Sequence, residues 1–223
     1  MDLHLYHSYL FFDLDSKFYQ LSEKDRASQK RAFVSILLAK ESMIIESYAT
    51  LGLKTKTTFM LWVRGKDPDS IQELVRDIAR SQFGASLQLS YSFFGIARES
   101  KYSGRHGKPE QTMQNFSDRM PYFIVYPFTK TTQWHQMSFE DRRQIMGEHV
   151  KVGLCYETIR QCLLYSYGID DYEFVVSYET TDLVKFQDLV VDMRQTKSRL
   201  YTQTDIPIFT CIHKPIKDLE KWL

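Results

Sequence analysis

The sequence FMLWVRGKDPDSIQELVRDI at residues 59–78 recurs as FVVSYETTDLVKFQDLVVDM at residues 174–193, shifted by a constant 115 positions. In both copies an apolar, β-branched run is followed by an aspartate and then by apolar residues at helical spacing. This pattern predicts a strand that leads directly into a helix. Asp67 and Pro68 strengthen the first of these helix starts, because proline at the first helical position loses no hydrogen bond.

A second match extends the repeat toward the beginning of each copy. Ser22 and Asp25 correspond to Ser138 and Asp141, at a shift of 116. A serine followed three residues later by an acidic side chain is a helix-start signal, because the hydroxyl accepts a hydrogen bond from an unpaired backbone N–H. We therefore expect a further helix in each copy, ahead of the strand that opens the longer match.

The two copies share one predicted order of elements. In the first copy the strands and helices fall at 3–13, 22–40 (helix), 42–51, 57–64, 68–82 (helix) and 86–97. In the second copy they fall at 121–128, 139–156 (helix), 158–167, 172–180, 182–196 (helix) and 204–213, with a turn at Gly168 to Asp171. The order βαββαβ is the ferredoxin-like motif. We expect an α+β chain of two tandem ferredoxin-like domains, residues 1–110 and 118–223, joined through the polar stretch 100–117.

Composition narrows the class of protein. With 29 basic and 28 acidic residues, the 223-residue chain lacks the basic excess that is typical of nucleic-acid-binding proteins. No apolar run approaches the length of about 18 residues that a membrane span needs. The N-terminus does not resemble a signal peptide, and the three cysteines show no CxxC spacing. We expect a cytoplasmic protein with reduced thiols, no nucleic-acid partner and no membrane span.

The second copy carries reactive side chains at positions where the first copy is apolar. The three matched pairs are Leu10 with Tyr126, Leu14 with Lys130 and Phe33 with His149. Because the first copy builds the same elements from apolar residues, the fold itself does not require a tyrosine, a lysine or a histidine there. We infer that a molecule bound to the second copy requires them.

His149 shares one predicted helix face with four apolar residues, Ile145, Val152, Tyr156 and Ile159. It is therefore expected to point inward, away from Arg142 and Arg143. Gly147 and Gly153 flank it, each at a cost of about 1 kcal/mol relative to alanine in a helix interior. Small residues around an inward imidazole leave room for a flat group. The alternative is a core histidine whose hydrogen bond is satisfied within the protein.

The motifs of the second copy follow a characteristic order. They are Tyr126-Pro-Phe-Thr-Lys130, Trp134, His149, Gly168-Ile-Asp-Asp171 and Thr196-Lys-Ser198. This ordered set, within residues of about 120–213, resembles the chlorite dismutase family, which includes the coproheme decarboxylases of haem synthesis. The resemblance implies that the two repeats form a dimeric α+β barrel, that the C-terminal repeat binds haem (coproheme or haem b), and that the protein is a homopentamer.

The resemblance assigns a role to each porphyrin-binding residue. His149 is expected to be the axial ligand of the haem iron, a common role for a neutral imidazole. Lys130 is expected near the propionates, although a solvated lysine at a strand end is the alternative. Trp134 is expected either to stack on the edge of the porphyrin ring or to close the barrel. Met146 and Ser198 complete the expected cofactor-binding set.

Tyr126 is the expected radical-forming residue, because the coproheme decarboxylases carry a tyrosine in this sequence context. The chain has 14 tyrosines, and only the position relative to Lys130 singles this one out. With Lys130 and Gln161 it forms the expected catalytic set.

Two positions separate the branches of the family. Chlorite-degrading members carry an arginine on the distal strand; counting back from Gly168 gives Gln161 here, and counting forward from His149 gives Cys162. Arg160 should face away from Gln161 by strand alternation. Chlorite-degrading members also have a glutamate where Ser198 stands, and a carboxylate would strengthen the axial imidazole more than a hydroxyl does.

These residues favour a coproheme decarboxylase-like enzyme, in which hydrogen peroxide drives the oxidative decarboxylation of coproheme propionates to give haem b. Two alternatives remain open. One is a chlorite dismutase or weak haem peroxidase, which the short spacing between Lys130 and Trp134 favours. The other is a haem-binding protein without turnover.

Overall fold

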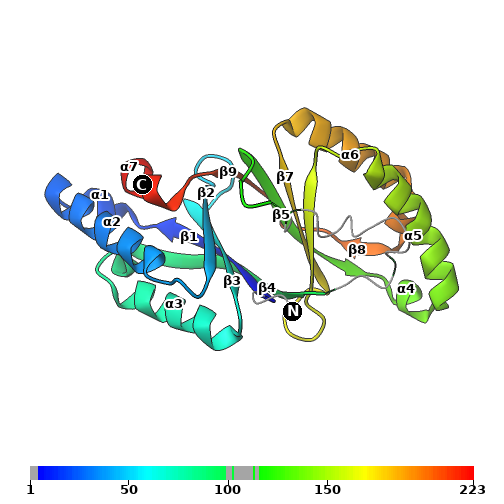
Figure 1. Cartoon of the computed structure of the whole chain (residues 1–223), viewed down its shortest axis with the longest axis horizontal. Helices are drawn as coiled ribbons and strands as arrows, with labels where there is room; N and C mark the ends of the chain where they lie inside the picture. The colour runs from blue at the N-terminus through cyan, green and yellow to red at the C-terminus, as the bar shows by residue number, and fades with distance from the viewer. Residues whose placement is uncertain (1–4, 99–101, 103–112, 114–115) are drawn as a thin grey trace. The chain divides into compact units, whose positions relative to one another are not determined.

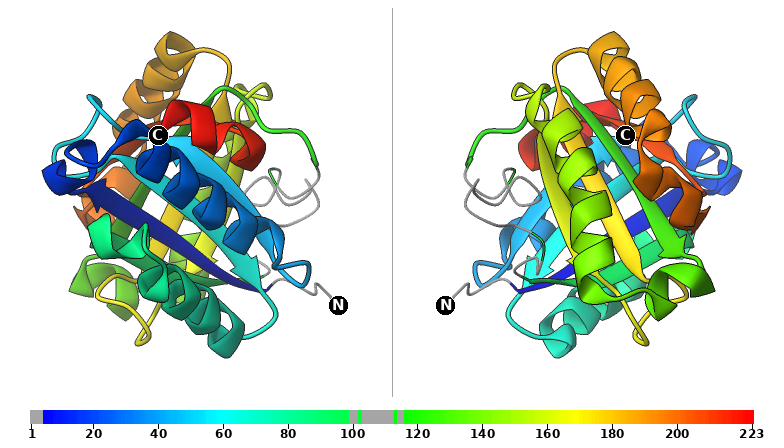
Figure 2. Two further views of the ribbon diagram at one scale, coloured as in Figure 1. Left: turned by 90° about the vertical axis from the view of Figure 1, so that its left-hand side faces the viewer. Right: turned by 90° about the vertical axis from the view of Figure 1, so that its right-hand side faces the viewer.

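The computed structural model describes residues 5–98, 102, 113 and 116–223. Most of the predicted connection at 100–117 lies outside these residues. The chain divides into two compact units, one formed by residues 1–96 with 210–223 and the other by residues 97–209. Each unit consists of an antiparallel sheet with two long helices on one face (Figures 1 and 2).

The first unit follows the predicted βαββαβ order closely. Its main elements are β1 (Tyr6–Leu14), α2 (Glu23–Leu38), β2 (Ile44–Ala49), β3 (Phe59–Gly65), α3 (Pro68–Arg80) and β4 (Leu87–Ala97). Short helices α1 (Ser16–Tyr19), η1 (Gly84–Ser86), η4 (Ile216–Asp218) and α7 (Leu219–Trp222) complete it. Its strands pair in the order β4-β1-β3-β2-β9, where β9 is Phe209–His213.

The first unit has a filled core between its sheet and its helices. α2 contributes Phe33, and β3 contributes Phe59, whose ring lies 5.7 Å from that of Phe33. Leu37, one helical turn after Phe33, is also buried. Apolar residues from β1 and α3 close the cluster, and Leu219 of α7 joins it. Packed apolar side chains fill the space between this sheet and its helices.

The second unit repeats this arrangement, including a short helix after its first strand, where α4 takes the place of α1. Its elements are β5 (Tyr122–Lys130), α4 (Thr132–Gln136), α5 (Phe139–Leu154), β6 (Arg160–Tyr165), β7 (Phe174–Thr180), α6 (Leu183–Gln195), η3 (Lys197–Tyr201) and β8 (Thr202–Thr204). Its strands pair in the order β6-β7-β5-β8. The turn between β6 and β7 contains Gly168 at φ 71°, a left-handed conformation that glycine adopts without strain.

The repeated helix starts have the predicted cause. Ser22 Oγ accepts a hydrogen bond from the Asp25 N–H at 3.1 Å, and Ser138 Oγ accepts one from the Asp141 N–H at the same distance. Asp67 caps α3 by accepting from the Ser70 N–H at 2.7 Å. Local side-chain chemistry therefore sets the start of the long helices in both units.

The C-terminal segment differs from the predicted strand at 204–213. β8 ends at Thr204 and β9 begins at Phe209, because Pro207 between them has no N–H to donate to a sheet. β9 then pairs with β2 through Tyr48 opposite His213. Residues 210–223 thus belong to the first unit, whereas the sequence placed them in a second domain at 118–223.

Within the described part of the chain, no helix has the length and apolar composition that crossing a bilayer requires.

Candidate functional site

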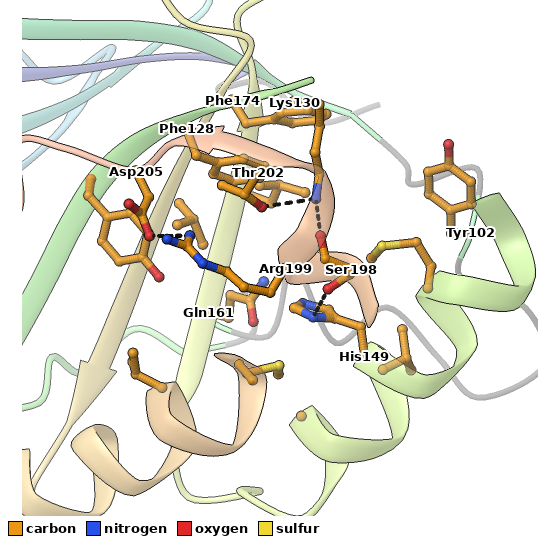
Figure 3. A pocket seen from close by; sticks show the side chains of 18 of the residues that line it. Tyr102, Phe128, Lys130, His149, Gln161, Phe174, Ser198, Arg199, Thr202 and Asp205 are labelled. Carbon is orange, nitrogen blue, oxygen red and sulfur yellow. Dashed lines mark hydrogen bonds and ion pairs between the residues drawn. The ribbon is translucent and has the colours of Figure 1, made fainter. Parts of the chain in front are cut away.

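A cavity of about 740 Å³ lies in the second unit, between its sheet and the helices α5 and α6 (Figure 3). Strands β5, β6 and β7 supply one wall, the two helices supply the other, and η3 and α4 contribute side chains at its margins. The volume falls within the range of about 300–1,000 Å³ that is typical of small-molecule sites. Aromatic and aliphatic side chains make up most of the lining.

The cavity occupies the position of the first unit's core. Repeat-equivalent pairs of core and cavity residues are Phe12 and Phe128, Phe59 and Phe174, Leu61 and Val176, Val63 and Tyr178, Ile71 and Phe186, Leu74 and Leu189, and Ile78 and Met193. Two further pairs change more drastically, from Phe33 to His149 and from Leu37 to Gly153. The second unit therefore keeps the sheet and helices that enclose a core, but its replaced side chains no longer fill the space between them.

Gly153 contributes directly to this hollow. A Cβ at this position would lie 3.1 Å from Cε of Met193, a second lining residue. Gly147, which the sequence grouped with it, does not line the cavity and has nothing within 4 Å of its Cβ position. Only one of the two glycines therefore makes room next to His149.

His149 lies on the cavity wall with a fixed ring. Its Nδ1 is 3.0 Å from Oγ of the buried Ser198 (Figure 3). Ser198 Oγ in turn lies 3.0 Å from Oγ1 of Thr196. This leaves Nε2 as the ring nitrogen for a ligand. Burial, assisted by the positive charge of Lys130, lowers the pKa of His149 to about 4. The imidazole is therefore neutral at physiological pH, as a metal ligand must be.

Lys130 ends β5 with its ammonium inside the protein. Its Nζ lies 3.5 Å from the Ser198 carbonyl oxygen and 3.4 Å from Oγ1 of Thr202 (Figure 3). It also sits 4.8 Å from the centre of the Trp134 ring. Burial lowers the pKa of Lys130 to about 8. The two hydrogen-bond partners of this buried ammonium are neutral, and Glu173 is the nearby carboxylate that acts on its charge. A buried cation of this kind is well suited to an anionic ligand.

Tyr126 and Gln161 are both on the sheet wall of the cavity. Tyr126 stacks on Tyr178 with ring centroids 6.1 Å apart. Burial, the largest cause, raises the pKa of Tyr126, so its phenol stays protonated. Tyr178 lies directly opposite Gln161 in the β6–β7 pair. The three side chains form a row across the wall.

Of the two residues expected at the distal position, Gln161 lines the cavity, whereas Cys162 is fully buried and does not line it. Arg160 faces away, as strand alternation predicted. Its guanidinium lies 3.1 Å from a carboxylate oxygen of Asp118 and 3.7 Å from one of Glu179.

Trp134 and Met146 also line the cavity. Trp134 is buried, and its ring packs against those of Tyr201 and Tyr102 at 5.8 and 6.3 Å. The structure thus brings together all seven residues that the sequence singled out: Tyr126, Lys130, Trp134, Met146, His149, Gln161 and Ser198.

Helix α5 differs from its prediction in two respects. It ends at Leu154, so Tyr156 and Ile159 lie beyond the helix. Arg142, predicted to face solvent, lines the cavity because it stands seven residues, about two turns, before His149. The face of α5 that was expected to be packed borders the cavity instead, and none of its residues is fully buried.

Several lining residues were missed from the sequence. Arg199 and Asp205 form an ion pair of 2.7 Å at the wall (Figure 3), and Arg194 reaches the same carboxylate oxygen at 3.2 Å. Tyr178 carried a usable signal, because it aligns with the core residue Val63. His135 carried none, since at the shift of 116 it aligns with Tyr19 on the equivalent short helix α1, and Tyr19 is exposed and not part of the first core.

Comparison with known proteins identifies the family. The model of the family described as chlorite dismutase matches residues 17–214. The chain belongs to the chlorite dismutase family. This confirms the resemblance inferred from the motifs of the second copy, and the match extends over the first copy as well.

Relatives of this chain in the family have two different names. A coproheme decarboxylase from Mycolicibacterium smegmatis is 25% identical over 164 residues, which cover 73% of this chain and 70% of that protein. A chlorite dismutase from Ideonella dechloratans is 25% identical over 191 residues, which cover 82% and 67%. Both names are those of enzymes, and the level of identity is the same.

Solved structures of the family have the same fold. The chlorite dismutase from Candidatus Nitrospira defluvii, in complex with imidazole, superposes with a TM-score of 0.90 over all of this chain and 96% of that one, at 23% identity. A further chain, assigned only provisionally as a chlorite dismutase, has a TM-score of 0.85 and 28% identity over 99% of both chains. The α+β, ferredoxin-like fold is therefore confirmed.

Proposed function

We propose that this protein is a haem-dependent oxidoreductase of the coproheme decarboxylase type, which uses hydrogen peroxide to convert porphyrin propionates to vinyl groups. One observation carries the proposal. A core-sized cavity places a neutral histidine, a buried lysine and a buried tyrosine on its walls, with a glutamine on the distal strand. The relative named coproheme decarboxylase supports this reading.

The lining fits a porphyrin. Its aromatic and aliphatic walls suit the macrocycle, and the missing side chain at Gly153 gives a flat group access to the wall beside His149. His149 would hold the iron through Nε2, because Ser198 occupies Nδ1. A hydrogen bond to the ring nitrogen that does not hold the metal fixes the orientation of a ligating imidazole. When bound, the iron would supply the oxidising power that peroxide delivers.

The chain's own residues would position the reacting propionate and take part in its oxidation. Lys130 offers a charge-assisted hydrogen bond to the carboxylate, at the end of the strand that also carries Tyr126. For each propionate, one peroxide and one proton enter, and a vinyl group, one CO₂ and two waters leave. The propionate loses two electrons and peroxide gains two. The Tyr126 phenol, kept protonated by burial, would relay the oxidation by giving up a hydrogen atom.

Chlorite dismutation is the second candidate, because the chain between Lys130 and Trp134 is short and leads directly into α4. Two observations weigh against it. Gln161 stands on the distal strand where the family's chlorite-degrading members have arginine, and Ser198 stands where they have glutamate. Fixed positive charge beside a developing anion is typically worth several kcal/mol, so oxygen release from chlorite should be slow. A haem-binding protein without turnover is the third candidate.

The deciding experiment is mass spectrometry of coproheme incubated with the protein and hydrogen peroxide. We expect two successive mass losses, one for each of two propionates. Tyr126→Phe should bind coproheme almost normally yet yield little product, whereas Lys130→Ala should weaken binding itself. Equal product formation by Tyr126→Phe and the wild type would remove the relay role. Rapid oxygen evolution from chlorite without mass loss would favour the second candidate.

We also propose that the protein is a homopentamer, as its resemblance to the family implies, and that it is cytoplasmic. Five chains of 26.4 kDa would weigh about 130 kDa, in a closed ring of the cyclic type. Light scattering at micromolar concentration checks this, and a stable monomer would contradict it.

A further inference from the structure

An imidazole–carboxylate pair lies at the edge of the cavity. Nε2 of His135, on α4, is 2.7 Å from Oε1 of Glu173, which immediately precedes β7. The second oxygen of the same carboxylate, Oε2, accepts a hydrogen bond from the backbone N–H of Lys130, also at 2.7 Å. Glu173 therefore connects His135 to the strand end that carries the buried ammonium.

The side chain of His135 faces the cavity and is also partly exposed to solvent. It is a lining residue, yet 38% of its side chain is exposed. Besides Glu173, the groups around this edge are the Tyr167 ring at 6.1 Å and the nearby Arg142 and Lys130, which also line the cavity. Glu173 and Arg142 both act on Tyr167, whose pKa burial raises. An imidazole in this place can exchange protons with water on one side and face the ligand on the other.

The proposed reaction needs such a group, because it consumes one proton for each propionate. The phenols of Tyr126 and Tyr178 are poor suppliers, because burial raises their pKa values, and Gln161 does not titrate. Lys130 is the expected partner of the propionate. His149 is the expected iron ligand. Histidine is the side chain that exchanges protons most readily near neutral pH.

We propose that His135, held by Glu173, is the proton entry of this cavity and supplies the proton that each decarboxylation consumes. This inference rests on the proposed function. Glu173 acts as a positioning residue, because one carboxylate oxygen orients the imidazole ring while the other holds the strand end at Lys130.

The test compares His135→Gln and Glu173→Ala with the wild-type protein over a range of pH. Glutamine can still hydrogen-bond to Glu173 but cannot titrate. The chain provides a matched control in His213, which lies 3.7 Å from Glu46 in the other unit and does not line the cavity. His213→Gln should leave the pH profile of coproheme turnover unchanged.

We expect His135→Gln to lower turnover by roughly tenfold or more, in the lower part of the range for general acid–base groups, with little change in coproheme affinity. At fixed pH and ionic strength, its rate should rise with the concentration of an acidic buffer, which would replace the missing proton donor. Unchanged turnover and no buffer dependence would overturn the proposal.

A second readout needs no porphyrin. In the ligand-free protein, proton NMR should show the Nε2–H of His135 as a downfield, hydrogen-bonded signal, because Oε1 of Glu173 lies 2.7 Å away. Glu173→Ala should remove this signal, and its retention would refute the pairing. If the wild type itself forms no vinyl product, the proposed function fails and the proton role fails with it. If the wild type forms vinyl product and His135→Gln forms it at the same rate, the proposed function stands and only the proton role fails.

Discussion

Helices α2 and α5 are equivalent in the repeat but bury different amounts of side chain. Both have 16 residues, and both start at a serine that caps the N–H three residues on at 3.1 Å. α2 buries Phe33 and Leu37 completely or nearly so, whereas α5 has no buried residue. At the two equivalent positions α5 carries His149 and Gly153, which border a cavity of about 740 Å³.

The difference shows how a binding site can arise from a core. The sheet, the two helices and their caps are retained, and only the filling changes. Cavities of this kind lower stability because large-to-small replacements lose both transfer free energy and packing. The first unit keeps its full apolar core, and so one half of the chain is built for stability and the other for binding.

The most severe test of this comparison restores the core in the second unit. The double substitution His149→Phe with Gly153→Leu copies the α2 residues into α5. We expect ferric porphyrin affinity to fall by at least about 100-fold, since the iron ligand and the space beside it both disappear. The ligand-free protein should gain about 1–3 kcal/mol from added apolar burial and a better helix former.

A Soret titration and urea unfolding of the same double variant measure both effects. Gly147→Leu is the matched control, because this glycine lies on the same helix, outside the cavity and with free space around it. It should leave porphyrin affinity unchanged. Wild-type affinity in the double variant would show that the ligand binds elsewhere.

The paired phenylalanines Phe59 and Phe174 give the next largest effect. Phe59 is fully buried in the first core, whereas Phe174 is only partly buried at the cavity wall, stacked on Phe128 at 4.6 Å. Phe59→Ala should destabilise the ligand-free protein by about 3–5 kcal/mol. Phe174→Ala should cost about 1–2 kcal/mol, because it enlarges an existing cavity. Denaturant unfolding measures both losses. Equal losses of unfolding free energy in the two variants would contradict the distinction between a filled core in the first unit and a hollow one in the second.

Lys130, equivalent to Leu14, should make the second unit sensitive to pH. Its pKa is lowered from 10.5 to about 8 in the folded chain. Between these values the folded state has released a proton that the unfolded state still binds, so the stability of the ligand-free protein should rise with pH. The rise is of the order of 3 kcal/mol at most. Lys130→Leu should remove this part of the pH dependence, as followed by unfolding at pH 7 and pH 10.

An exposed lysine on α5, Lys151, provides the control for that measurement. Lys151→Leu should retain the wild-type difference between the two pH values. The same difference in Lys130→Leu would mean that the ammonium is not desolvated in the fold.

The smallest effect should be identical in the two units. Ser22→Ala and Ser138→Ala each remove one capping hydrogen bond of the same length. Each should cost about 1 kcal/mol, since capping energy depends on local geometry and not on what the helix packs against. Thermal unfolding of the two variants checks this. Clearly unequal losses of stability would contradict the view that the two helices start in the same way in both units.

Much of the candidate site was accessible from the sequence through the repeat. Aligning His149 with Phe33 showed that a core position had become reactive, and the same register would have singled out Tyr178 opposite Val63. Arg142 and His135 were not accessible in this way. Arg142 matches an arginine in the first copy, and His135 matches Tyr19, which does not belong to the first core. Their alignment therefore gave no sign that they line a cavity.

The sequence by itself determined the local features of this protein. Caps, turn glycine and apolar periodicity each act within a few residues, so they set the helix starts, the strands and the βαββαβ order of both copies. The tertiary structure alone decided which equivalent helix face would be filled and which would border a cavity. It also decided that β9 would pair with β2 of the first unit. Packing volume and strand partners depend on residues far apart in the chain, which no local pattern specifies.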